Sequence, residues 1–211
     1  MDIAIPIAGK QTSVKVEFKD MGNYICRHGF KGGKPFATVS DYLSDAPAGV
    51  VEDLLTFMFS GKKGAPTIFE DYVSSDGFIL AKRPVFLGRG SFTCTSEGNF
   101  RSLSESVQRL YDAGLVEESD ISNTYITWTK RKTKRVLGRC HWMFRVISIS
   151  PILDSDGISE ECLDFVVYHE FLHIRQGLLT GKRHHTAAFR REERQFPDYE
   201  RIQKELARIG S

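Results

Sequence analysis

Residues 163–173 read LDFVVYHEFLH, and this stretch decides how the rest of the chain is interpreted. His169 and His173 are four residues apart, so on a helix they lie one turn apart on the same face. Both imidazoles can therefore reach one ion at about 2.0–2.1 Å, the usual zinc–nitrogen distance. Glu170 follows the first histidine, where its carboxylate can take a proton from water held by the ion. The pattern predicts one bound zinc ion.

The sequence around the motif predicts a buried helix. Leu163 to Tyr168 are nearly all apolar, Ser159 can cap the helix, and Gly177 can close it. A buried helix that carries His, Glu and His has to satisfy three polar groups, and a bound metal satisfies them together. The alternative is a pair of core histidines that hydrogen-bond to backbone groups or carboxylates.

A catalytic zinc ion needs a third protein ligand, and the fourth position is left for water. The candidates follow His173, in a short polar segment and in the acidic stretch after it, and the segment 178–183 is long enough to bring a histidine back to the ion. Glu193 lies twenty residues beyond His173, a spacing that also occurs in thermolysin-like peptidases. The residues alone leave five candidates open: His184, His185, Glu192, Glu193 and Glu200.

The order of elements in the second half predicts an α+β fold. Strands are expected at 125–128 and 144–149, between a helix near 103–111 and the helix of the H-E-x-x-H motif. A last helix is expected from Asp198. Strands and helices do not alternate as they would in a parallel βαβ fold. We therefore expect a small antiparallel sheet packed against helices that include the active-site helix.

Residues 1–100 are expected to form an N-terminal accessory region of strands followed by helices, ahead of a catalytic domain over 101–211. Val14, Val16 and Phe18 alternate with charged residues as in a half-buried strand, and Tyr24 to Cys26 would pair back after a turn.

Helices are expected next in this first half, and then a less regular segment. One helix would begin at Ser44-Asp45-Ala46-Pro47 and end at Gly61, and a shorter one would span 68–73. From 75 to 99 the glycines and isolated apolar residues predict irregular structure or short strands.

The bulk composition describes an ordinary globular protein. Of its 211 residues 41% are hydrophobic and 27% charged, and a formal net charge of +2 points to no particular partner. The four cysteines are scattered without a CxxC pair, which excludes a zinc ribbon visible in sequence and favours reduced thiols over disulfides. No leader peptide and no apolar run of about 20 residues is evident, so we expect a cytoplasmic protein without a membrane segment.

A local basic cluster lies between the two expected strands, with Trp128, His141 and Trp142 interleaved. It can contact nucleic-acid phosphates, with Trp142 available for stacking, or it can be the solvated face of a β-hairpin. Its members are Lys130, Arg131, Lys132, Lys134, Arg135, Arg139 and Arg145.

From Asn123 to Ile209 the chain resembles the SprT-like metallopeptidase family, which includes the Spartan proteases and is related to the YgjP-like group. The shared features are Trp128 before a basic stretch, then the segments LGRC (137–140), ISIS (147–150), YHEFLH (168–173), HTAAF (185–189) and FPDY (196–199). The resemblance implies a zincin-type fold and peptidase activity. It also implies that the third ligand is the histidine of an H-x-x-x-F segment, which His185 with Phe189 fits and His184 does not.

These observations predict a zinc metallopeptidase in which His169, His173 and His185 bind Zn²⁺ and Glu170 is the general base. Resemblance to Spartan-type proteins adds DNA-associated proteins as a substrate class, although no further DNA-binding or zinc module is visible in this chain. One alternative is a nucleic-acid-associated protein whose zinc site is structural or vestigial. Another is an enzyme that acts on a small amide or peptide.

Overall fold

The computed structural model describes residues 1–22, 24–61, 66–177 and 185–210. They fold into two compact units, Met1–Phe78 and Ile79–Ser211, and the division falls inside helix α3 (Asp76–Arg89). Residues 79–100 therefore belong to the second unit. The catalytic domain was expected to start later, at residue 101.

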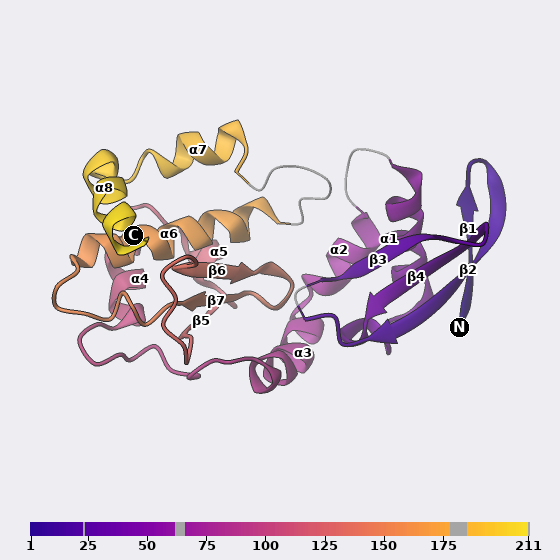
Figure 1. Cartoon of the computed structure of the whole chain (residues 1–211), viewed down its shortest axis with the longest axis horizontal. Coiled ribbons are helices and arrows are strands. Elements are labelled where there is room, and N and C mark those ends of the chain that lie inside the picture. The colour runs from indigo at the N-terminus through magenta and orange to yellow at the C-terminus, as the bar shows by residue number, and fades with distance from the viewer. Residues whose placement is uncertain (23, 62–65, 178–184, 211) are drawn as a thin grey trace. The chain divides into compact units, whose positions relative to one another are not determined.

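The first unit is a four-stranded sheet with two helices (Figure 1). Its strand order is β1-β2-β4-β3, with β1 at Asp2–Ile7, β2 at Lys10–Lys19, β3 at Cys26–Lys31 and β4 at Lys34–Ser40. The strand expected through Val14 and Val16 is confirmed as β2, and both residues are buried. The expectation that residues 24–26 pair back on it is wrong. β4 pairs with β2 in parallel, so β3 can reach only the outer edge of β4.

Helices α1 (Ala48–Ser60) and α2 (Thr67–Val73) confirm the two helices expected in this unit. α1 begins after Pro47, whose fixed φ suits a helix start, and ends at Gly61, where a φ of 60° favours glycine. Its buried residues recur at helical spacing and form the apolar stripe that packs in the core: Val50, Val51, Leu54 and Leu55.

Helix α3 corrects the prediction that residues 75–99 are irregular. Its two glycines and Pro84 disfavour a helix interior, so the local pattern indicates no helix. Packing within the second unit outweighs these preferences. Phe86 stacks on Phe144 with ring centroids 4.3 Å apart, and Arg83 Nε donates to the Phe144 carbonyl at 2.8 Å.

The second unit contains a three-stranded sheet of order β5-β7-β6, built from β5 (Tyr125–Trp128), β6 (Gly138–His141) and β7 (Val146–Ile149). β6 and β7 are antiparallel but β5 and β7 are parallel, so the expected antiparallel sheet is in fact mixed. The reason is the long connection 129–137, which lets β6 form on the far side of β7. The strand expected from residue 144 begins at Val146, because a 3₁₀ turn occupies Trp142–Phe144.

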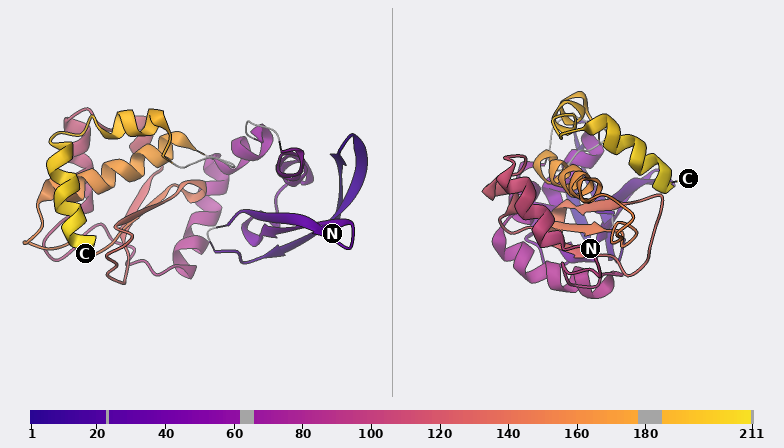
Figure 2. Two further views of the ribbon diagram at one scale, coloured as in Figure 1. Left: turned by 45° about the horizontal axis from the view of Figure 1, so that its top comes forward. Right: turned by 90° about the vertical axis from the view of Figure 1, so that its left-hand side faces the viewer.

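The remaining helices are α4 (Leu103–Asp112), α5 (Glu118–Ile121), α6 (Glu160–Gln176), α7 (Ala187–Glu193) and α8 (Tyr199–Gly210). α6 is buried from Cys162 to Tyr168 and contacts the sheet and each of the other four helices. Figure 2 shows α7 on the side of α6 opposite the sheet. The α+β class and the extent of the motif helix are thus confirmed. The described helices include none with the length and apolar character that a membrane span requires.

Candidate metal centre

Three histidines meet where α6 passes the start of α7. His169 and His173 lie on α6, and His185 directly precedes Thr186, the N-cap of α7. One potential ligand atom from each histidine lies within 4.8 Å of those of the other two. The structure therefore brings together the three residues expected as metal ligands, in a cluster that can hold a metal ion. His184, the competing candidate, lies outside the described residues.

The spacing of two of the three histidines fits a tetrahedral ion. His173 Nε2 and His185 Nε2 are 3.2 Å apart. Two nitrogens bound tetrahedrally to one zinc ion at about 2.0–2.1 Å would be about 3.3 Å apart. Three imidazoles that converge in this way form a donor set that zinc takes in catalytic sites.

Phe189 packs beneath the cluster and holds the three rings in place. Its ring centroid lies 5.0 Å from that of His169, 4.7 Å from His173 and 4.8 Å from His185. Phe189 is buried, and its backbone N–H donates to the side chain of Thr186 at 3.1 Å, which closes the first turn of α7. The H-x-x-x-F spacing thus places an aromatic ring where it restricts the rotation of the histidines.

Glu193 contacts the cluster through the ring of His169. Its Oε1 lies 2.7 Å from His169 Nδ1, and Tyr199 donates its hydroxyl to the other carboxylate oxygen at 3.3 Å. Burial raises the pKa of Glu193, but hydrogen bonds and charge from His169 more than offset this and leave the pKa below its usual value. A carboxylate on Nδ1 selects the tautomer whose Nε2 is free to bind a metal. Glu193, one of the candidate ligands, therefore orients His169 in this structure.

Replacing Glu193 with glutamine is expected to weaken zinc binding by about 10–100-fold, the usual effect of removing the partner of a metal-binding histidine. A competition titration against a chelating dye measures this affinity. Glu200→Gln, at an exposed candidate on α8, is the control and should bind as tightly as wild type. Unchanged affinity in Glu193→Gln would contradict the orienting role, and a loss as complete as in His169→Ala would make Glu193 a ligand.

Glu170 is buried beside the cluster, with 5% of its surface exposed. Burial raises its pKa to about 7, against opposing effects of His169, the Cys140 backbone hydrogen bond and Arg139. Gly138 on β6 makes room for it, since a Cβ there would lie 2.6 Å from Glu170 Oε1. A larger residue there would force the side chains of Glu170 and Val166 to shift, so glycine is favoured where the edge strand approaches the helix.

The cluster opens into a cleft between β6 and the C-terminal half of α6, with a volume of about 380 Å³. Its walls carry the histidines, the buried carboxylate and the edge of β6. The lining residues are Gly138, Arg139, Cys140, Trp142, His169, Glu170, His173, Gln176, Gly177 and His185.

The basic stretch does not form a hairpin face. Lys130, Arg131, Lys132, Lys134 and Arg135 are exposed on the connection 129–137, and only Arg139 lies on a strand, at the rim of the cleft. Arg145 is not part of this cluster, because its Nη2 donates to the carbonyl of Asp120 at 2.9 Å. Trp128 is buried and donates its indole N–H to the carbonyl of Ser96, whereas Trp142 lines the cleft.

Comparison with protein families identifies the same part of the chain. The model described as the SprT-like family matches residues 102–205. Residues 102–205 belong to the SprT-like family. A search of curated protein sequences finds no match. The SprT-like domain runs from the N-cap of α4 into α8 and contains the whole metal centre, including the third histidine and Glu193.

Two residues of this SprT-like domain have a role at the site that differs from what the sequence predicted or that the sequence did not predict. Gly138 was noted only within the motif LGRC, and its contact with Glu170 arises from strand–helix packing. Glu193 was considered only as a ligand, because spacing along the chain does not distinguish a carboxylate that binds the ion from one that binds a histidine. Glu193 lies on the same helix as Phe189, and this position is the feature of the sequence that could have indicated its role.

Proposed function

We propose that the SprT-like domain is a zinc-dependent metallopeptidase of zincin type. His169, His173 and His185 would hold the ion, and Glu170 would be the general base. The observation that carries this proposal is the convergence of three imidazoles beside a buried carboxylate in an open cleft.

The residues of the site have separate tasks. Zinc, when bound, polarises the scissile carbonyl and makes water more acidic. Glu170 takes the proton from the attacking water and returns it to the leaving amine. Its raised pKa suits this role near neutral pH, and the positive charge of an ion on the histidines lowers that pKa again. The Cys140 backbone N–H fixes the direction of the carboxylate.

A structural zinc site is less consistent with these features. Such sites are closed by four protein ligands, whereas the cluster found among the described residues has three and borders a cleft. A structural site also has no use for Glu170. Burial of a carboxylate is unfavourable, so its place beside the three histidines supports a chemical role.

Metal analysis and a cleavage assay on the full chain test the proposal. We expect about one zinc per chain, cleavage of an unfolded protein such as casein, loss of cleavage with a chelator and recovery with added zinc. The proposed metal centre would be refuted if protein that was never exposed to a chelator contains no transition metal and takes none up. Zinc retained without cleavage of any protein or peptide would favour the structural alternative.

A second function, nucleic-acid binding, is favoured by the exposed cations of the connection 129–137. This basic loop is anchored at Thr133, whose backbone N–H donates to Ser150 Oγ at 2.9 Å. Its five Lys and Arg side chains point into solvent next to the strand that borders the cleft. Phosphates bound there would bring DNA-associated substrates close to the metal centre.

Neutralising Lys132, Lys134 and Arg135 together should weaken binding to a DNA or RNA duplex. The slope of log affinity against log salt should fall by roughly 0.9 for each phosphate that the variant no longer binds. Fluorescence anisotropy over a salt series measures both. The control neutralises Lys10, Lys31 and Lys34, three exposed cations of the first unit, for the same change in net charge. No binding by wild type at low salt would leave the loop as a solvated surface.

A further inference from the structure

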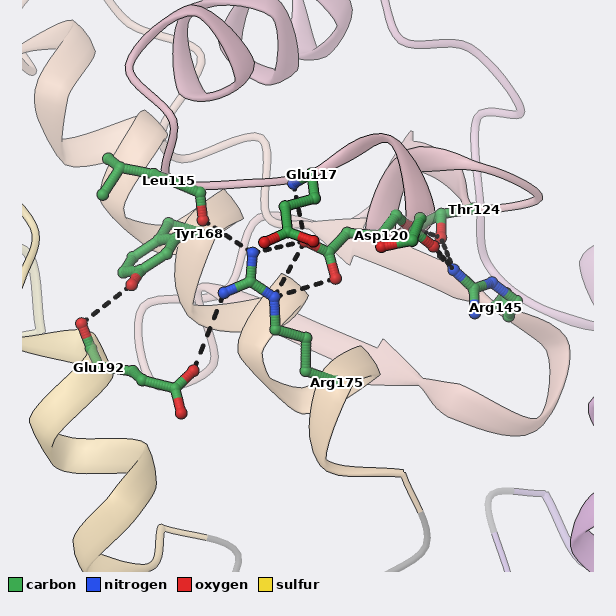
Figure 3. Close-up of polar contacts among 9 residues, drawn as sticks. Leu115, Glu117, Asp120, Thr124, Arg145, Tyr168, Arg175 and Glu192 are labelled. Carbon is green, nitrogen blue, oxygen red and sulfur yellow. Dashed lines mark hydrogen bonds and ion pairs between the residues drawn. The ribbon is translucent and has the colours of Figure 1, made fainter.

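The helix that follows the third histidine is joined to α6 by a polar network beyond the metal centre (Figure 3). Tyr168 donates its hydroxyl to the backbone carbonyl of Glu192 at 2.9 Å. The next residue of α6, His169, contacts the next residue of α7, Glu193, at 2.7 Å. Two consecutive residues of α6 thus hold two consecutive residues of α7.

Arg175 connects this arrangement to α5. Its Nε donates to both carboxylate oxygens of Asp120 at 2.9 Å, and its Nη2 donates to the carbonyl of Leu115 at 2.9 Å. Its Nη1 lies 3.8 Å from a carboxylate oxygen of Glu192 on α7. One guanidinium therefore bridges the end of the motif helix, the α5 turn and α7, as Figure 3 shows.

The anchor of Arg175 is itself fixed on two sides. Asp120 is buried, and its Oδ2 accepts the backbone N–H of Glu117 at 2.8 Å. The backbone carbonyl of Asp120 accepts Nη2 of Arg145, which also donates to Thr124 Oγ1 at 3.1 Å. The bond to Glu117 closes the first turn of α5, and Arg145 ties this turn to the segment before β7, so Arg175 is bound to a partner that does not belong to α7.

We infer that Tyr168 and Arg175 are positioning residues that hold α7 against α6 and thereby keep His185 and Glu193 at the metal. The inference rests on the proposed zinc centre. α7 has only seven residues, too few for a stable isolated helix, so its place depends on tertiary contacts. When α7 detaches, His185 and Glu193 leave the site together. The apparent zinc affinity therefore scales with the fraction of molecules in which α7 is attached.

Tyr168→Phe tests this inference with a close control in Tyr125→Phe. Tyr125 also donates its hydroxyl to a backbone carbonyl at 2.9 Å, that of Cys94, in the same unit but outside the network. Hydrogen exchange of the α7 amides is measured in metal-free protein, and zinc release to a chelator in loaded protein. For Tyr168→Phe both rates should rise about fivefold, the size expected from one hydrogen bond, and for Tyr125→Phe neither should.

Arg175→Lys is the second variant, because lysine keeps the charge but cannot make the fork of hydrogen bonds to Asp120. Arg175→Lys should also raise both rates, that of hydrogen exchange in α7 and that of zinc release. Equal rates in Tyr168→Phe, Tyr125→Phe and wild type would overturn the inference while leaving the zinc centre intact. Wild type that takes up no zinc would instead refute the proposed function, and α7 exchange would still report whether Tyr168 holds the helix.

Discussion

Glu170→Gln is expected to lower the rate of peptide-bond cleavage by about 10²–10⁴, the usual contribution of a positioned general base. Glutamine keeps the size of the side chain and fits beside Gly138, but it cannot accept the water proton at neutral pH. The three imidazoles are unchanged, so zinc content should stay at the wild-type value. Steady-state cleavage, with metal analysis of the same samples, measures both quantities.

Glu161→Gln is the control, because Glu161 is exposed in the first turn of the same helix. It should cleave at the wild-type rate. Equal cleavage by wild type and fully loaded Glu170→Gln would refute the proposed base. Loss of zinc from Glu170→Gln would mean that Glu170 supports the ion itself, and the three-histidine centre would have to be redrawn.

His185→Ala should weaken zinc binding by more than about a hundredfold and abolish cleavage. A zinc site worth about 10–16 kcal/mol with four ligands assigns roughly 3 kcal/mol to each ligand. His169→Ala and His173→Ala should have effects of similar size. Chelator competition by each variant, followed by the cleavage assay in excess zinc, measures the loss.

Two histidines serve as controls for this prediction. His28 is exposed in the first unit, and His28→Ala should keep wild-type affinity. His184→Ala should weaken zinc binding far less than His185→Ala, because only His185 is four residues before Phe189. If the His184 and His185 variants bind zinc with equal affinity and Glu193→Ala loses zinc, the result would support Glu193 as a thermolysin-like third ligand in place of His185.

The regular helices could be predicted from sequence because their determinants are local. α6 has its apolar run, Ser159 before it and Gly177 after it, and α1 lies between Pro47 and Gly61. α3 could not be predicted, since its glycines and Pro84 argue against a helix, and the contacts that favour it, from Phe86 and Arg83 to Phe144, are tertiary. The mixed sheet was missed for a related reason. Strand direction depends on where the connection 129–137 returns, which residue patterns do not specify.

The sequence by itself determined the motif pair, because helix periodicity places His169 and His173 on one face. It also limited the third ligand to five candidates, and resemblance to a family favoured His185. Only the tertiary structure placed His185 against His173 and Glu193 behind His169, since both depend on how α7 docks on α6. The same docking brings Tyr168 and Arg175 into the network. Contacts between separate helices are set by the packing of the whole unit, and spacing along the chain carries no record of them.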